Sequence, residues 1–302
     1  MAEWFKAHAW NACIGETLSW VRIPLSPPKK MKNNIIYKLK KNIRRITEFP
    51  LVEIKDRIVQ TTNEFCIPNN VYQTWETRFL GKTHANSIKL FRDNNPSLSF
   101  YLFDKKKRDD YMSSNWSNHD ISNIYFSSLF GPMKADIFRY CILYDLGGYY
   151  FDIAKGCNVP LTQLHNQNHD GIITYEENTF FYPPKNKNLF NLKRPFNYFL
   201  QWGLAFQAKH PFLKELIDEI SKNYDFYKNI EFDNPKLAIL NFTGPGMYTK
   251  VMRKYLSENP NNNLKELDIK FGNQGIFKLK GSSVRHYIIP SYTYLTNSMI
   301  CR

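Results

Sequence analysis

The chain has 302 residues and a formal net charge of +14, with 43% hydrophobic and 16% aromatic residues. This length suits one large α/β domain with short appendages, and the hydrophobic fraction excludes an intrinsically disordered chain. A charge of this size raises nucleic acid as a partner. Half of it comes from one segment, because residues 29–60 carry ten Lys or Arg and three acidic residues, a net of 10 − 3 = +7. With no nucleic-acid-binding motif beside it, we expect no nucleic-acid partner.

The five cysteines are odd in number and widely spaced: Cys13, Cys66, Cys141, Cys157 and Cys301. They form no CxxC pair and no His/Cys cluster with the spacing of a zinc site. We therefore expect free thiols in a reducing, cytoplasmic compartment. No apolar run approaches the roughly 20 residues that span a bilayer, so we expect no transmembrane helix.

Residues 1–30 show neither helical nor strand periodicity, although three of the six tryptophans lie there. Reverse translation suggests a reason. Residues 21–24 can be written GTT CGA ATC CC, the T-arm sequence of transfer RNA genes, and residues 26–28 can be written TCT CCG CCA, which ends in the CCA tail. Our hypothesis is that residues 1–30 are a translated transfer RNA gene and that the natural chain starts at Met31. A real but disordered tail is the alternative.

Residues 31–62 are expected to form a basic amphipathic helix and a linker. The apolar residues of this helix fall near one face, among lysines and arginines: Ile35, Ile36, Leu39, Ile43 and Ile46. Through residues 31–48 it could lie on an anionic membrane surface, at the inner face of the membrane. Packing on the domain, with a basic outer face, is an equally good interpretation.

A single domain is expected over residues 63–302. We predict strands over 67–75, 97–104 and 149–153, and helices over 84–96 and 133–148, with a lysine-rich helical stretch between them. Strands that alternate with helices indicate an α/β layered sheet. The second half of the domain is predicted to be rich in loops, with one helix over 210–224 and a glycine turn over 242–248.

Three charged residues meet near the end of the third predicted strand. Asp152 lies at its carboxyl end, where open α/β sheets bind ligands. Asp136 and Arg139 are three apart on the preceding helix and share a face, and Gly147 and Gly148 then turn the chain into the strand. The two acids could accept sugar hydroxyls while the arginine binds charge, so together they could bracket a sugar phosphate. An ordinary salt bridge within the helix is the alternative.

Residues 135–153, ADIFRYCILYDLGGYYFDI, resemble the hallmark of the DXD-motif glycosyltransferase sugar-binding-region family, S/A-D-x-x-R-Y-x-x-L-x-x-x-G-G-x-Y-x-D-x-D. The matching residues are Ala135, Asp136, Arg139, Tyr140, Leu143, Gly147, Gly148, Tyr150 and Asp152. The blocks IPNNVYQTW, NPSLSFYLFD, AKHPFL and FTGPGMYT also resemble the family, so the likeness runs over 67–249. Golgi initiating mannosyltransferases and bacterial capsular polysaccharide glycosyltransferases are members.

The resemblance implies a GT-A-type fold, a nucleotide-diphospho-sugar-binding α/β domain with a mixed central sheet flanked by helices. It implies sugar transfer, with retention, from a nucleoside diphosphate sugar to a hydroxyl of a glycan or lipid-linked acceptor, in cell-surface or capsular polysaccharide biosynthesis. Asp136, Arg139 and Asp152 would be catalytic, and Asp152 would bind Mn²⁺ or Mg²⁺. The full set expected to bind the donor is Gln73, Thr74, Trp75, Asp136, Arg139, Tyr140, Gly147, Gly148, Asp152, Lys155, Gly244 and Gly246.

Several positions depart from the family pattern or allow a second interpretation. Ala154 replaces the second acid of the DXD motif, Tyr72 replaces a histidine, and no H-x-x-x-S-W segment follows residue 285. Metal dependence therefore stays open, and Lys155 could offer the diphosphate a fixed positive charge in place of the cation. The loop with Gly244 and Gly246 could approach phosphates through its backbone N–H groups or be a structural turn. A catalytically silent domain that binds nucleotide sugar or glycan is the alternative to an enzyme.

Overall fold

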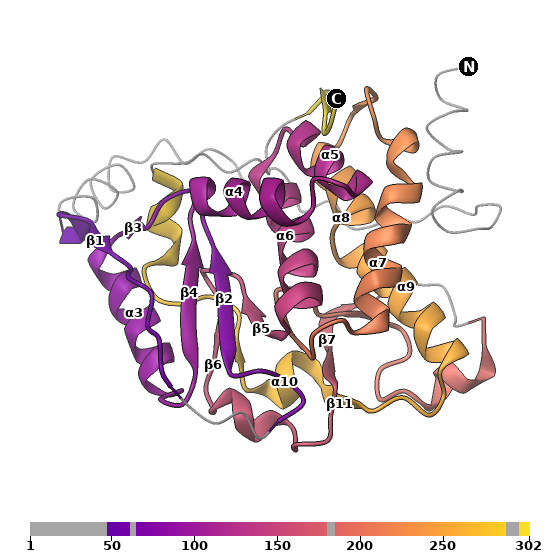
Figure 1. Cartoon of the computed structure of the whole chain (residues 1–302), viewed down its shortest axis with the longest axis horizontal. Coiled ribbons are helices and arrows are strands. Elements are labelled where there is room, and N and C mark those ends of the chain that lie inside the picture. Colours follow the sequence, from indigo (N-terminus) through magenta and orange to yellow (C-terminus); the bar gives the residue numbers. More distant parts are fainter. Residues whose placement is uncertain (1–46, 61–64, 180–184, 288–295) are drawn as a thin grey trace, which may run out of the picture.

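The computed structural model describes residues 47–60, 65–179, 185–287 and 296–302 (Figure 1). Residues 1–30 and most of the amphipathic helix, 31–46, lie outside the described residues, so the transfer RNA and membrane-helix hypotheses stay predictions. No helix in the described ranges combines the length and hydrophobicity that a membrane span requires.

A seven-stranded mixed sheet forms the centre of the molecule (Figure 1). Its order is β11-β7-β9-β5-β2-β4, and β8 pairs with β7. The strands are β2 (Asn70–Thr74), β4 (Ser99–Phe103), β5 (Gly148–Phe151), β7 (Gly171–Thr179), β8 (Asn197–Phe199), β9 (Gly203–Phe206) and β11 (Leu264–Asp268). The expected α/β fold, with a mixed central sheet flanked by helices, is confirmed.

The strand directions bring several chain segments to one edge of this sheet. Strands β2, β4 and β5 are parallel, and β9 runs antiparallel to both β5 and β7. Strand β7 therefore points the same way as β5, and β11 is parallel to β7. The carboxyl ends of all five parallel strands thus meet at one edge, which is where Asp152 follows β5.

Three two-stranded ribbons complete the strands of the described ranges. They pair β1 (Val52–Glu53) with β3 (Phe79–Leu80), β12 (Gly275–Ile276) with β6 (Gly156–Cys157), and β10 (Glu231–Phe232) with β13 (Ser298–Met299). The second ribbon ties the segment after Asp152 to the C-terminal part of the chain.

Helices cover both faces of the sheet. They are α3 (Lys82–Asp93), α4 (Lys105–Asn115), α5 (Asp120–Ser127), α6 (Gly131–Leu146), α7 (Pro211–Lys222), α8 (Pro235–Phe242), α9 (Pro245–Glu258) and α10 (Ile269–Asn273). Short 3₁₀ helices lie at Leu161–Leu164, Lys187–Asn191, Tyr224–Phe226 and Ser282–Tyr287.

Two hydrophobic cores follow from the alternation of side chains along the strands. Tyr72 and Tyr150 face the core formed with α5 to α9, whereas Val71 and Tyr149 face the opposite core, which includes Phe91 of α3. Figure 1 shows the same division, with α3 on one side of the sheet and α6, α7 and α9 on the other.

The predicted elements of the first half are confirmed, with bounds that differ by up to three residues, but the prediction of a loop-rich second half is wrong. That half supplies β7, β9, β11, α8 and α9. The predicted glycine turn over 242–248 is reduced to Thr243 and Gly244, because Pro245 occupies the first position of α9, where a missing N–H costs nothing. Strand β9 has only four residues, all of them buried, so its sequence lacks the alternation of apolar and polar residues that would predict a strand.

Gly147 and Gly148 form the junction between α6 and β5. Their φ angles are +63° and +104°, in the region that favours glycine. A Cβ on Gly148 would lie 2.4 Å from the carbonyl oxygen of Asn70, and one on Gly147 would lie 2.5 Å from the backbone nitrogen of Ala208. The two glycines therefore let α6 turn sharply and let β5 pair closely with β2.

We expect Gly148→Ala to lower the free energy of unfolding by about 3 kcal/mol, because steric overlap adds to the cost of a left-handed backbone. Gly272 is the matched control, since its φ is +66° but nothing lies within 4 Å of the position of a Cβ. Gly272→Ala should cost only about 1 kcal/mol. Urea unfolding of both variants measures the difference, and equal losses would contradict the packing argument.

Candidate active site

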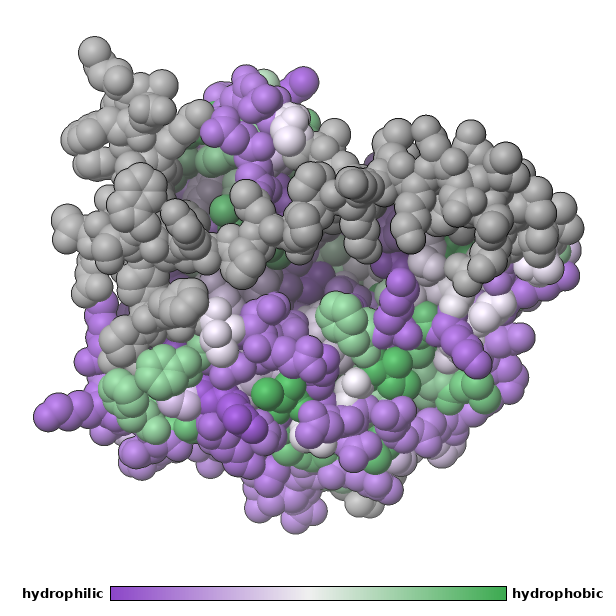
Figure 2. Space-filling model, turned by 180° about the vertical axis from the view of Figure 1, so that it is seen from behind, coloured by the Kyte–Doolittle hydropathy of each residue, from purple (hydrophilic) through white to green (hydrophobic). Residues whose placement is uncertain are grey.

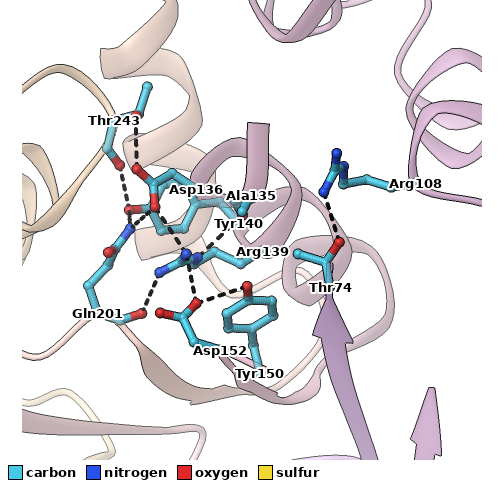
Figure 3. Close-up of polar contacts among 10 residues, drawn as sticks. All are labelled: Thr74, Arg108, Ala135, Asp136, Arg139, Tyr140, Tyr150, Asp152, Gln201 and Thr243. Atoms are coloured by element: carbon cyan, nitrogen blue, oxygen red, sulfur yellow. Dashed lines mark hydrogen bonds and ion pairs between the residues drawn. The ribbon is translucent and has the colours of Figure 1, made fainter. Parts of the chain in front are cut away.

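The candidate active site lies where the first half of α6 passes the carboxyl end of β5. Arg139 is at its centre, because its Nη2 lies 3.0 Å from Asp152 Oδ1 and 3.1 Å from Asp136 Oδ1. Figure 3 shows the guanidinium between the two acids. The three charged residues expected from the sequence are therefore brought together.

Arg139 is almost fully buried and is held on several sides. Its Nη1 donates to the carbonyl oxygen of Gln201 at 3.0 Å, and its guanidinium carbon lies 4.7 Å from the centroid of the Tyr150 ring. Burial alone would lower the pKa of Arg139, but Asp152, Tyr150 and Asp136 together raise it. The positive charge is therefore permanent and fixed in place.

Both carboxylate oxygens of Asp136 have protein partners. Besides Arg139, its Oδ1 accepts from Gln201 Nε2 at 2.9 Å, and its Oδ2 accepts from the Thr243 hydroxyl at 3.0 Å. Burial raises the pKa of Asp136 to about 6, opposed by the charge of Arg139. In this structure Asp136 thus holds Arg139 in place, and its expected direct contact with a sugar stays a prediction.

Asp152 is the acid that remains open. Its Oδ1 accepts from Arg139 and, at 3.1 Å, from the Tyr150 hydroxyl. Its Oδ2 accepts no hydrogen bond from the described residues, and its side chain is 32% exposed. A ligand can therefore reach one oxygen of a carboxylate whose orientation is already set.

Two members of the site, Gln201 and Thr243, are not among the residues expected to bind the donor. Both hold Tyr140 as well as Asp136: Gln201 Nε2 lies 2.5 Å from the Tyr140 hydroxyl, which donates to the Thr243 carbonyl oxygen at 2.7 Å. Tyr140 is fully buried, so it contacts the site from the interior. Thr243 could have been found from its place before the Gly-Pro-Gly block, whereas Gln201 carries no local signal.

The three residues at the end of β2 lie in different surroundings. Thr74 is buried, and its hydroxyl donates to the Phe103 carbonyl oxygen at 2.8 Å and accepts from Arg108 Nη1 at 3.0 Å. Figure 3 shows Thr74 and Arg108 apart from the Arg139 cluster. Gln73 is fully buried, and neither atom of its amide has a hydrogen-bond partner in the described part of the chain.

Trp75 lies under the C-terminal segment. The Arg285 guanidinium carbon is 5.1 Å from the centroid of its ring, and the His286 ring is 5.9 Å away, edge to face. The sequence there lacks the H-x-x-x-S-W type of segment that is typical of many family members. The structure instead brings the 3₁₀ helix Ser282–Tyr287 onto Trp75.

The four glycines expected at the donor site all lie where the chain packs closely, and their role in donor binding stays a prediction. Gly147 and Gly148 begin β5, at the opposite end of the strand from Asp152. A Cβ on Gly244 would lie 2.9 Å from the Leu240 Cα, and one on Gly246 would lie 2.7 Å from the Asn241 Oδ1. The last two glycines allow α8 and α9 to pack closely, which favours the structural-turn interpretation.

Two cations, Lys155 and Arg285, interact electrostatically with Asp152. Burial lowers the pKa of Lys155 to about 8; Asp152 and Glu176 oppose this shift, while Arg285 and Lys270 add to it. Burial also lowers the pKa of Arg285, and Asp152 opposes that shift. Glu176 and its neighbour Glu177 lie at the end of β7, and Glu177 Oε1 pairs with Lys270 Nζ at 2.7 Å.

The described residues do not form a divalent-cation site made of protein ligands alone. No group of three His, Cys, Asp or Glu side chains within the described ranges could hold a metal ion. Ala154 offers no ligand, and Asp152 Oδ1 is already bound by Arg139. The expectation of Mn²⁺ or Mg²⁺ thus has one acid, Asp152, to support it.

Residues 81–170 match the family described as a glycosyltransferase sugar-binding region containing the DXD motif. The resemblance expected from the sequence is confirmed. The DXD-family region contains Asp136, Arg139, Asp152 and Lys155, whereas Gln201, Thr243 and Arg285 lie beyond it.

Proteins of similar sequence include two mannosyltransferases. The initiation-specific alpha-1,6-mannosyltransferase of Candida albicans is 26% identical over 209 residues, which cover 63% of this chain and 53% of that protein. Inositol phosphoceramide mannosyltransferase 1 of Schizosaccharomyces pombe is 28% identical, over 52% of this chain and 43% of that protein. The chain thus spans about half the length of these two relatives.

Two further comparisons cover more of the matched protein. An uncharacterised glycosyltransferase of Acanthamoeba polyphaga mimivirus is 24% identical, over 68% of this chain and 72% of that protein. Among solved structures, PaToxG glycosyltransferase matches with a TM-score of 0.46 and 14% identity, covering 84% of this chain and 80% of that one.

Proposed function

We propose that this chain is a glycosyltransferase that moves a hexosyl group from a nucleoside diphosphate sugar to a hydroxyl of a glycan or lipid-linked acceptor. One observation supports this proposal best. The buried guanidinium of Arg139 holds Asp152 so that one carboxylate oxygen stays open at the carboxyl edge of the sheet. Mannose is the first donor sugar to test, because the named relatives are mannosyltransferases.

In this proposal Asp152 Oδ2 accepts a hydrogen bond from a hydroxyl of the donor sugar. The acceptor oxygen forms a bond to the anomeric carbon, the bond from that carbon to the diphosphate breaks, and the acceptor proton passes to the leaving diphosphate. Negative charge develops on the leaving group, so fixed positive charges near it lower the barrier. Retention at the anomeric carbon is part of the proposal and follows from the family resemblance.

The cellular setting is also a proposal. Four of the five cysteines are described, and all four are free thiols, which supports a reducing, cytoplasmic location. Residues 31–48 would bring the enzyme to an anionic membrane that carries the acceptor. The product would be a cell-surface glycan, of which capsular polysaccharide is one candidate and a membrane glycolipid another.

A second candidate function is a silent domain that binds nucleotide sugar or glycan without turning it over. Ala154 favours this alternative, because a metal-dependent relative would need an acid there. Turnover of a nucleotide sugar separates the two functions.

A thermal-shift screen of nucleoside diphosphate sugars, with Mn²⁺ or with EDTA, tests the proposal. A donor at 100 times its Kd should raise the Tm by about 5 to 10 °C, since it binds only the folded state. Donors that raise the Tm are then assayed for hydrolysis and transfer. Binding without turnover supports the silent domain, and no shift with any nucleotide sugar contradicts both functions.

A further inference from the structure

We infer that two protein cations, Lys155 and Arg285, bind the diphosphate of the donor in place of a metal ion. This inference rests on the proposed function and deepens it. Lys155 follows the missing acid at Ala154, and Arg285 comes from the C-terminal 3₁₀ helix beyond the family's matched region. The ligand class is a diphosphate ester.

Lys155 is placed by the turn that follows β5. Its backbone N–H donates to the Asp152 carbonyl oxygen at 2.8 Å, so the two residues sit in one turn. Its ammonium lies 3.1 Å from the centroid of the Phe277 ring and 5.3 Å from that of Trp202. Lys155 forms no salt bridge with any described residue, so contact with aromatic faces and longer-range attraction to Asp152 and Glu176 compensate its partly buried charge.

Arg285 comes from the 3₁₀ helix Ser282–Tyr287. Its Nη1 donates to the Ser282 carbonyl oxygen, and its guanidinium covers the ring of Trp75. Its Nε is buried and has no partner within the described ranges, where the side chain also forms no salt bridge. Arg285 therefore carries a positive charge with no acidic partner in the described structure, next to Trp75 and within electrostatic range of Asp152.

The charges around Asp152 favour an anion over a second cation. Asp136 and Asp152 are both paired with Arg139, and Lys270 is paired with Glu177. Lys155 and Arg285 are thus the two positive charges there without an acidic partner in the described structure. A divalent ion beside them would be repelled, whereas a diphosphate could accept charge-assisted hydrogen bonds from both side chains.

Lys155 and Arg285 both lie against aromatic rings. Figure 2 shows hydrophilic residues separating small hydrophobic groups on one face of the molecule. Lys155 lies over the ring of Trp202 and Arg285 over the ring of Trp75, and both interact electrostatically with Asp152. Such placement holds them partly desolvated, which strengthens their interaction with an incoming anion.

Calorimetric titration in EDTA tests the inference on the full chain, with inorganic pyrophosphate, uridine diphosphate and guanosine diphosphate as probes. Pyrophosphate measures the diphosphate contact alone, and the nucleotides show whether a donor rather than free diphosphate is the better ligand. We expect the native protein to bind at least one nucleoside diphosphate equally well with EDTA and with Mn²⁺. Lys155→Met, which keeps the packing, and Arg285→Gln should each weaken metal-free binding by about 10- to 100-fold.

Lys270→Met is the matched control, because Lys270 is already paired with Glu177. It should weaken binding by less than about threefold. Circular dichroism confirms that each variant is folded. Strict dependence on Mn²⁺, or native affinity in both Lys155→Met and Arg285→Gln, would overturn the inference and leave the proposed function standing. Failure of the native protein to turn over any nucleotide sugar would instead overturn the proposed function. The binding of diphosphates would still test whether Lys155 and Arg285 bind this group.

Discussion

Asp152→Asn should lower kcat/KM for sugar transfer by about 100-fold or more while the protein remains folded. Asparagine keeps the size of the side chain, and its carbonyl oxygen can still accept from Arg139. The NH₂ group would then occupy the place of Oδ2, where it cannot accept a hydrogen bond from a sugar hydroxyl. Loss of a hydrogen bond to a charged group costs about 1.5 to 3 kcal/mol, to which the unbalanced charge of Arg139 adds.

Asp145→Asn is the matched control. Asp145 lies near the other end of α6, where its carboxylate accepts from Tyr111 and Trp116 and pairs with Lys209. Its loss should reduce stability and leave kcat/KM within about threefold of the native value. A similar loss of activity in both variants would show that Asp152 acts through the fold. If the native protein shows no turnover, weaker nucleotide-sugar binding in Asp152→Asn would support the silent domain.

Local patterns predicted the part of the site that lies on one helix and the next strand. Asp136, Arg139 and Asp152 fall within a short segment whose helical spacing and glycine stop are visible in the sequence, and the structure joins them as expected. The sequence also predicts a role for Lys155, because this residue follows Ala154, the position of the missing acid. Periodicity suffices here because helix α6 and strand β5 are adjacent in the chain and in space.

The remaining members of the site come from distant positions. Gln201 and Thr243 reach Asp136 across 65 and 107 residues, and such contacts leave no local period in the sequence. Arg285 is further still, on a segment whose pattern departs from the family. Gly147 and Gly148 show a different limit of the sequence. Their presence can be read from it, but only the structure shows that the backbones of Ala208 and Asn70 leave no room for a Cβ at these two positions.

Arg139→Met should lower the free energy of unfolding by about 3 to 5 kcal/mol at pH 7, the second large effect that the structure predicts. Methionine fills much of the same volume but leaves Asp136 buried without a cation, and breaking a buried ion pair in this way is costly. Urea unfolding followed by circular dichroism measures the loss. The double variant Asp136→Asn/Arg139→Met should recover part of the stability, since it removes the uncompensated charge while Gln201 and Thr243 keep polar partners.

The pH dependence of Arg139→Met identifies the buried acid as the cause. Burial already raises the pKa of Asp136 to about 6, above its value of about 3.8 in the unfolded chain, and Arg139 opposes that shift. Without Arg139 the pKa rises further. The folded state then binds more protons than the unfolded state between the two pKa values, so its stability increases as pH falls through the folded pKa. Arg139→Met should therefore lose most stability above pH 7 and least near pH 4, relative to the native protein. A loss that is the same at both pH values would point to packing alone.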